Sequence, residues 1–380
     1  MKILVLNAGS SSVKCWYADL VAPLPPEAPK PLWSTQLNPS SGEWIGALLA
    51  ALEPLWSIQP PQEIDIVGHR VVHGGSQYRR TTWVTPEVRE AIARQEEFAP
   101  AHNRFELEAI QRMGELLGPR ARQAAVFDTG FHSTLEPPAY VYPGPYEWLD
   151  RGLRRFGFHG ISFQYAARRA SQLLGRENPR LLMCHLGNGA SLAAVRGMKC
   201  LDTTMGFTPL EGLMMGSRSG SVDPGILIYL LRRAGAIESR SAAGDLDHIL
   251  NQGSGLKGIS GLSGDMREIQ AAAESGNPRA KLAFDIYIHR LCREAGGMIA
   301  VLGGLDAIVF TGGVGENSAA VREALCRQLA FLGVDLDPDK NAHPHPDQDV
   351  ASHGSAVRAL VVHAEEEWEI ARECFALSQR

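Results

Sequence analysis

The sequence has 380 residues, of which 44% are hydrophobic and 21% are charged. This length and composition exclude a disordered chain and favour two or three folded domains, with one large domain as the alternative. Lysine and arginine total 37 and aspartate and glutamate total 42, so the net charge is −5. We therefore expect no general nucleic-acid-binding surface and no surface for anionic membranes. Glycine is abundant at 39 residues, which predicts tight turns or loops that approach a ligand closely.

The cysteines and the apolar runs indicate a cellular compartment. The six cysteines form no CxxC pair, which favours reduced thiols over disulfides or a zinc site. The apolar run at residues 3–6 is too short for a signal peptide. The longest membrane-helix candidate, residues 295–310, is interrupted by glycine pairs and Asp306. We predict a cytoplasmic protein.

The first part of the chain alternates short apolar runs with helical patterns. Strands are predicted over residues 3–6, 13–20, 64–72 and 124–127, and helices over residues 46–56, 86–99 and 104–117. The proline-rich residues 23–39 predict a surface connection or an edge irregularity. Residues 140–158 are rich in aromatic side chains, proline and glycine, and we expect a domain boundary there.

The second part of the chain continues this alternation. Strands are predicted over residues 181–185, 192–195, 307–310 and 359–363, and helices over residues 162–174, 280–302 and 365–376 and from residue 319. The polar residues 335–353 predict a loop. The strand, turn and strand at the N-terminus recur with an offset of about 178 residues, which indicates an internal duplication. The pattern predicts two α/β lobes.

Three predicted strands run into glycine-rich polar turns, at residues 7–12, 187–191 and 312–317. Backbone amides in such turns bind phosphate oxygens without a side chain. One turn alone is better explained as a hairpin, but three of them favour a phosphate-rich ligand at the carboxyl ends of the strands, between the lobes. No GxxxxGK[ST] or GxGxxG motif follows a first strand, so neither a P-loop nor a dinucleotide fold is supported.

Charged residues beside these turns are candidates for catalysis. Arg70 ends a predicted buried strand and Arg218 lies in a glycine-rich loop. Either could form an internal ion pair, but together they favour a clamp on transferring oxygens. Asp128 follows a strand directly and is either a turn residue or a magnesium ligand or proton acceptor. His159 is the best histidine candidate because glycines and aromatic residues flank it.

Nine motifs, in a fixed order, support a family resemblance: VLNAGSSSVK, GHRVVHGG, FDTGFH, RFGFHG, CHLGNGAS, PLEGLMMGSRSG, GDMRE, AIVFTGGVGEN and EEWEIA. From Lys2 to about Arg372 the sequence resembles the acetate kinase family, in the actin–sugar kinase–heat-shock ATPase superfamily. The resemblance implies an α/β fold with a duplicated ribonuclease H-like (actin-like ATPase) two-lobe architecture and an active site in the interdomain cleft. Residues 1–150 plus 364–380 would form the N-terminal lobe. Residues 151–363 would form the C-terminal lobe, which would bind nucleotide and form a homodimer.

The resemblance also implies roles for individual residues. The catalytic residues would be Asp128, His159, Arg218 and Arg70. The carboxylate substrate would contact Arg70, Val72, Phe158, Pro209 and His102. The metal, Mg²⁺ or Mn²⁺, would be held by Asn7 and Glu366. ATP would be bound by Lys14, His185, Leu186, Gly187, Asn188, Gly189, Asp265, Met266, Arg267, Gly313, Val314, Gly315, Glu316 and Asn317.

The implied reaction is reversible, direct in-line transfer of the ATP γ-phosphoryl group to acetate, giving acetyl phosphate and ADP. A carboxylate is already anionic, so the reaction needs positioning and charge neutralisation rather than a strong base. Ala101 replaces a usual leucine and Ser221 a usual acidic residue, and a pocket distinguishes one methylene only weakly. Propionate or another short-chain carboxylate is therefore the alternative substrate.

Two other functions are weighed against this one. A sugar or butyrate kinase would share the fold but use another acceptor. For a hydroxyl acceptor with an aspartate base, two substrate arginines are superfluous. A nucleotide-driven binding module, as in the heat-shock proteins, would need an added peptide-binding domain or a polymerising surface. The carboxylate kinase agrees best with the residues.

Overall fold

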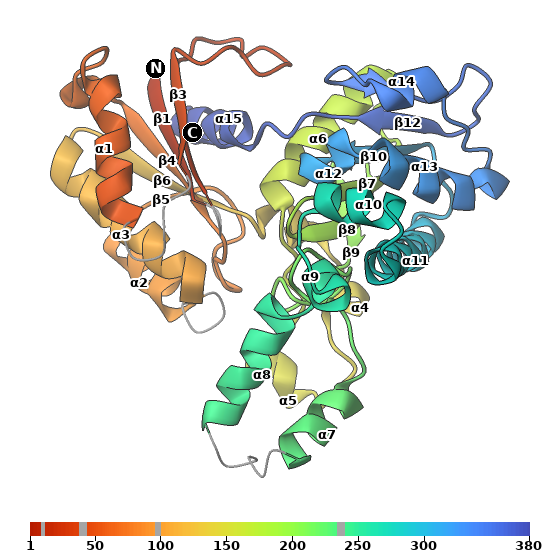
Figure 1. The fold of residues 1–380 in the computed structure, drawn as a ribbon. Helices are drawn as coiled ribbons and strands as arrows, with labels where there is room; N and C mark the ends of the chain where they lie inside the picture. Colours follow the sequence, from red (N-terminus) through yellow and green to blue (C-terminus); the bar gives the residue numbers. More distant parts are fainter. Residues whose placement is uncertain (9–11, 38–43, 96–99, 234–239) are drawn as a thin grey trace.

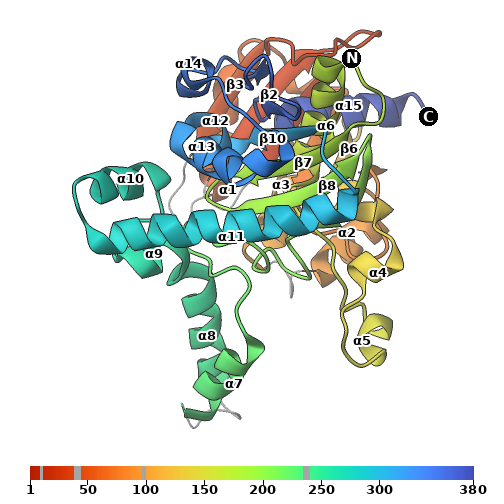
Figure 2. The same ribbon diagram turned by 90° about the vertical axis from the view of Figure 1, so that its right-hand side faces the viewer.

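The computed structural model describes residues 1–8, 12–37, 44–95, 100–233 and 240–380, without the side chains of residues 8, 100–102, 240 and 241. It contains two six-stranded mixed sheets covered by helices (Figures 1 and 2). Within these ranges, no helix combines the length and the apolar character that a membrane span requires.

The strands are β1 (Lys2–Ala8), β2 (Val13–Asp19), β3 (Trp33–Leu37), β4 (Ile66–Val71), β5 (Thr82–Trp83), β6 (Arg122–Phe127), β7 (Arg180–Leu186), β8 (Ala190–Arg196), β9 (Lys199–Thr203), β10 (Ala307–Thr311), β11 (Gln348–Asp349) and β12 (Arg358–Val361). The α-helices are α1 (Trp44–Trp56), α2 (Pro86–Arg94), α3 (Pro100–Leu117), α4 (Pro137–Tyr140), α5 (Glu147–Asp150), α6 (Gly160–Leu174), α7 (Pro224–Arg233), α8 (Arg240–Gln252), α9 (Gly255–Ser260), α10 (Met266–Glu274), α11 (Pro278–Leu302), α12 (Gly312–Asn317), α13 (Ala319–Gln328), α14 (Pro338–Ala342) and α15 (Glu366–Ser378). Three short 3₁₀ helices are η1 (Pro61–Glu63), η2 (Gly130–Thr134) and η3 (Ala330–Leu332).

The two sheets repeat one topology. The first has the order β3-β2-β1-β4-β6-β5 and the second β11-β12-β10-β7-β8-β9, which is the same order read from the other edge. β1 pairs antiparallel with β2 and parallel with β4. In the same way, β7 pairs antiparallel with β8 and parallel with β10. β1 begins at Lys2 and β7 at Arg180, so the predicted offset of about 178 residues is confirmed, and so is the α/β fold of two similar halves.

Two helices lie between the sheets. One hydrophobic cluster joins inward-facing side chains of β1 and β7 with residues of α6 and α15, including Val5, Met183, Phe163 and Ile370. α15 comes from the C-terminal end of the chain but packs on β1 and β4 of the first sheet (Figure 1). The sheets are therefore held together through a shared apolar layer.

The outer faces are covered by separate sets of helices. α1 and α3 cover the first sheet through residues such as Leu52 and Met113. α11 runs across the second sheet (Figure 2), starting where the Asn277 side chain accepts hydrogen bonds from two backbone amides and ending at Gly303, where φ is 68°. A glycine at this left-handed position is the common way for a helix to stop.

Three sequence predictions need correction. Residues 23–39 contain the edge strand β3, whose alternating exposure suits a sheet edge. Residues 335–353 contain α14 and β11 rather than only loop, because Asp337 caps a helix that opens with Pro338. The glycine-rich residues 312–317 form α12, which packs on β7 and β10. The helix opens with Gly312, where φ is 78° and a Cβ would stand 2.9 Å from the carbonyl oxygen of Leu186.

The structure also differs from the sequence predictions at the end of α2 and in the arm formed by α7 and α8. The helix predicted over residues 86–99 ends at Arg94, and residues 96–99 lie outside the described ranges. α7 and α8, which were not predicted, project away from the sheets (Figures 1 and 2). No residue of α7 is buried, so burial in the observed fold does not explain its apolar side chains.

Trp368 on α15 tests the shared layer between the sheets. Its side chain is fully buried, with the ring centroid 6.1 Å from that of Trp16. Trp368→Ala is expected to lower the free energy of unfolding by about 3–5 kcal/mol, because the cavity cannot collapse fully. Denaturant unfolding measures this change, with the half-exposed Trp148→Ala as the control. An equal loss of stability in both variants would contradict the role of Trp368 in the apolar layer between the sheets.

Candidate active site

A cavity of about 210 Å³ lies where strand ends of the two sheets meet. It is lined by Asn7, Ser12, Lys14, Arg70, Val72, Asp128, Phe158, His159, His185, Gly187, Asn188, Gly189, Pro209, Arg218 and Glu366. All except Ser12 were predicted as site residues, although they come from distant parts of the chain. Residues predicted to bind the carboxylate, the metal ion and the phosphates therefore line the same cavity.

Asp128 connects the two halves of the chain inside this cavity. Its Oδ2 accepts hydrogen bonds from Arg70 Nη2 and from the backbone N–H of His159, both at 3.0 Å. Its backbone carbonyl accepts from Gly160 N–H at 2.8 Å, and a Cβ on Gly160 would stand 2.2 Å from that oxygen. Asp128 thus fixes the end of β6 against the start of α6.

The Arg70 guanidinium lies deep in the site. Burial disfavours its charged form, but Asp128, Glu366 and Glu106 outweigh this effect and raise the pKa of Arg70. Arg70 therefore stays charged and is held in place by a carboxylate that is only 1% exposed. An oriented guanidinium of this kind matches the geometry of a carboxylate or phosphate.

Arg218 differs from Arg70 in its neighbours. Its Nη1 donates to the carbonyl of Pro209 at 3.0 Å, and no carboxylate among the described residues forms an ion pair with it. Burial lowers its pKa, although arginine remains charged near neutral pH. A partly buried cation whose described partner is a neutral carbonyl favours an anionic ligand at this position.

Two histidines stack against each other beside the cavity. The rings of His159 and His185 lie 4.1 Å apart at an angle of 21°. Burial, together with the neighbouring positive groups, lowers the pKa of His159 well below its ordinary value, and burial lowers that of His185. Both imidazoles are therefore neutral near pH 7 and act as hydrogen-bonding groups. A Cβ placed on Gly189 would lie 3.5 Å from His159 Nε2 and 3.4 Å from Arg218 Nη1.

Oxygen ligands for a cation lie at another wall of the cavity. Asn7 Nδ2 donates to Glu366 Oε2 at 2.9 Å and to Glu367 Oε1 at 2.6 Å, and Lys14 Nζ lies 3.8 Å from Glu367 Oε1. The described residues form no cluster of three or more histidine, cysteine or carboxylate ligands. Mg²⁺ commonly binds one or two carboxylates together with phosphates and waters, so Asn7 and Glu366 fit such an ion when a nucleotide is present.

The predicted apolar pocket is formed in part by described residues. Val72 and Phe158 are nearly fully buried and line the cavity with Pro209. The side chains of His102 and Ala101 lie outside the described part of α3. Their contribution to the pocket therefore remains a prediction.

The remaining predicted nucleotide residues lie outside the cavity lining. Leu186 is fully buried in β7. Asp265, Met266 and Arg267 open α10, where Asp265 caps the helix and pairs with Arg267 at 2.6 Å. α12 contains Gly313, Val314, Gly315, Glu316 and Asn317. Gln270 of α10 donates a hydrogen bond to the hydroxyl of Ser318, the residue that follows α12. The Glu316 carboxylate accepts from Gly312 and Ala364 N–H and lies 2.5 Å from His363 Nδ1.

Sequence reasoning missed several polar partners. Ser191 Oγ lies 2.9 Å from His159 Nδ1, and Ser162 Oγ lies 2.8 Å from His185 Nδ1. Ser191 closes the predicted turn at 187–191, so its position was a usable signal. Ser162 and Glu106 had none, because only the packing of α6 and α3 brings them to the site.

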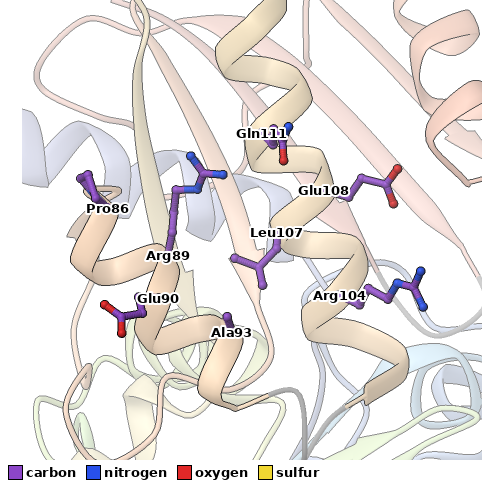
Figure 3. A pocket seen from close by; sticks show the side chains of 8 residues that line it. All are labelled: Pro86, Arg89, Glu90, Ala93, Arg104, Leu107, Glu108 and Gln111. Carbon is purple, nitrogen blue, oxygen red and sulfur yellow. The ribbon is translucent and has the colours of Figure 1, made fainter.

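A second hollow lies between α2 and α3 (Figure 3). It is lined by Pro86, Arg89, Glu90, Ala93, Arg104, Leu107, Glu108 and Gln111. Its charged side chains point in different directions and do not converge on one point (Figure 3). It contains none of the predicted site residues and is not a second candidate for the active site.

Comparison with known proteins decides the family. The model of the Acetokinase family matches residues 34–372, and an acetate kinase from Gloeobacter violaceus is 55% identical over 407 residues, which covers 99% of each chain. The chain belongs to the acetate kinase family. It is therefore a phosphotransferase of the group that uses a carboxyl group as acceptor.

Solved structures of the acetate kinase family support the fold. The crystal structure of the Porphyromonas gingivalis acetate kinase is 35% identical, with a TM-score of 0.86 and 99% of each chain covered. A propionate kinase from Francisella tularensis is 34% identical, with a TM-score of 0.85 and 98% of each chain covered. The two-lobe actin-like ATPase fold is thus shared, whereas this likeness does not separate the two substrates.

Asp128→Asn tests the Arg70–Asp128 ion pair in this acetate kinase family member. The variant loses the charge partner of buried Arg70, so we expect the free energy of unfolding to fall by about 3 kcal/mol or more. Denaturant unfolding measures this change. The control is Glu115→Gln, which removes the exposed pair with Arg112 and should leave stability unchanged. Wild-type stability of Asp128→Asn would show that this ion pair does not stabilise the fold.

Proposed function

We propose that this protein is an acetate kinase that transfers the γ-phosphoryl group of ATP to acetate, reversibly and by direct in-line transfer. The observation that carries the proposal is the pair of arginines, Arg70 and Arg218, in one small cavity with an apolar wall. Such a cavity holds two anionic groups close together and leaves room for a methyl group. The named activity of the relatives supports the same substrate.

The acetate carboxylate binds Arg70, and its methyl group lies against Val72, Phe158 and Pro209. Asp128 fixes the orientation of Arg70 and stands close to where the carboxylate attacks. The family resemblance alone adds His102 to this subsite. No general base is required, because the nucleophile is already anionic, and positioning lowers the barrier by making the encounter intramolecular.

The transferring phosphoryl group lies between Arg218 and His159. In the tautomer protonated at Nε2, His159 accepts from Ser191 at Nδ1 and donates from Nε2 beside Gly189. Arg218 and His159 then bind equatorial oxygens of the phosphoryl group, where negative charge spreads in the transition state. The absence of a side chain at Gly189 keeps both donors accessible.

The nucleotide lies along the second sheet. Lys14 and the turn from His185 to Gly189 contact its phosphates, and α10 and α12 surround the nucleoside. Asn7 and Glu366 would hold Mg²⁺, or Mn²⁺ in its place, and this ion would neutralise phosphate charge. We infer a nucleotide-binding C-terminal lobe of residues 151–363 and an N-terminal lobe of residues 1–150 plus 364–380.

We also infer a cytoplasmic homodimer that joins through the C-terminal lobe. Ile226, Ile228, Tyr229 and Leu230 on α7 and Ile249 on α8 are 41–54% exposed. Monomeric proteins rarely leave such a patch uncovered. A second copy of the chain, with the same arm, covers it.

Propionate is the second candidate substrate. Ala101, in place of a larger residue, favours it, because a smaller side chain would widen the pocket. One methylene changes binding by only about 1–3 kcal/mol, so both acids belong in the first assay.

Acyl-phosphate formation tests the proposed reaction. ATP, Mg²⁺ and acetate, propionate or butyrate are assayed in parallel, and the product is trapped with hydroxylamine. We expect turnover with acetate, and a loss of about 10²–10³-fold in kcat/KM for Arg70→Ala and Arg218→Ala, because each removes a preorganised positive group. Arg112→Ala on the surface is the control. Full activity of both cavity variants, or no acyl phosphate from any acid despite ATP binding, would overturn the proposal.

Sedimentation velocity tests the homodimer. Ile226→Asp places a charge in the exposed apolar patch of α7 and is expected to convert dimer to monomer at micromolar concentration. Phe331→Asp changes another exposed residue, 80% accessible on η3, and should leave the dimer intact. A wild-type protein that sediments as a monomer would refute the inference.

A further inference from the structure

Glu106 is a buried carboxylate that the proposed reaction does not use. It lies on α3, is 2% exposed, and both of its oxygens lie 3.1 Å from the backbone N–H of Val72, which donates to them. One turn earlier, Asn103 Nδ2 donates to the carbonyls of His73 and Ile92 at 3.3 and 3.1 Å. α3 therefore holds the main chain just after β4, where Arg70 and Val72 face the cavity.

Glu106 also belongs to the group of charges around Arg70. The charged groups that act on it among the described residues are Arg70, on β4, and Asp128, after β6. Burial raises the pKa of Glu106 to about 8, although Arg70 and the Val72 amide oppose this rise. Near neutral pH the carboxyl group is therefore mostly protonated, while Asp128 forms the ion pair with Arg70.

A bound substrate changes this charge arrangement. An anionic carboxylate on Arg70 adds negative charge beside a guanidinium that already faces Asp128, Glu366 and Glu106. A second negative charge on Glu106 would weaken that binding, whereas a neutral Glu106 leaves Arg70 available. Binding of the anion and protonation of Glu106 therefore favour each other, as linkage requires.

We propose that Glu106 is a positioning residue of the carboxylate subsite, and that at alkaline pH, where it is ionised in the free protein, it takes up a proton from solvent when the carboxylate substrate binds Arg70 and returns it on release. This inference rests on the proposed carboxylate kinase activity. It implies that the KM for the carboxylate depends on pH through Glu106, whereas the KM for ATP does not. A residue with a purely structural role would change neither pH profile.

Glu106→Gln separates these roles. The amide oxygen of glutamine still accepts from Val72 N–H, but the side chain cannot titrate. For the wild type, we expect the KM for acetate to rise by about tenfold between about pH 7 and about pH 9, as the carboxyl group ionises with full linkage. For Glu106→Gln, the KM for acetate should stay at its low value across this range. The KM for ATP should show no such difference between the two proteins.

Glu108→Gln is the matched control. Glu108 lies on the same helix but at the outer hollow (Figure 3) and is exposed, so this variant should keep the wild-type pH profile. A wild-type KM for acetate that does not change with pH overturns the inference even if Glu106→Gln fails to fold. An equal rise in KM in Glu106→Gln also overturns it. Turnover at any pH with a flat KM rejects only the role of Glu106, whereas absence of acyl phosphate at every pH rejects the proposed reaction.

Discussion

The carboxylate of Asp128 is the constraint on which the site depends. One of its oxygens receives hydrogen bonds from β4 and from the residue that opens α6, so a single side chain joins the first sheet to the second half of the chain. The close approach at Gly160 makes this junction tight, because any larger residue would collide with the Asp128 carbonyl. The positions of Arg70 and His159 are therefore coupled, and neither can shift without moving the other.

The two arginines divide the electrostatic work between them. Arg70 has a carboxylate partner that fixes its direction, whereas Arg218 contacts a carbonyl and presents its charge to the cavity. The neutral histidines add donors without adding repulsion toward these cations. An arrangement with one fixed and one available guanidinium suits two anionic groups that must approach each other, since like-charge repulsion is the main obstacle to their encounter.

Much of this architecture could be predicted from the sequence, for reasons that lie in local chemistry. Two of the three strands predicted to end in glycine-rich turns, those before residues 7–12 and 187–191, do end at the cavity, and the recurrence after about 178 residues predicted the paired sheets. The edge strand β3 and the helix α12 were misassigned, because proline and glycine usually interrupt regular structure and only tertiary packing reveals the exceptions. Glu106 and Ser162 could not be found, since their partners are distant in sequence and become neighbours only when α3 and α6 pack on the sheets.

The repeated topology also bears on how such an enzyme could arise. β1 and β7 hold equivalent places in their sheets, and Asn7 and His185, near their ends, line the same cavity. Two identical half-length chains that paired in this way would place every cavity residue in two symmetric copies. Because both halves belong to one chain, the first can carry Arg70 while the second carries Arg218. A repeated fold in a single chain thus permits a cleft whose two sides differ in chemistry.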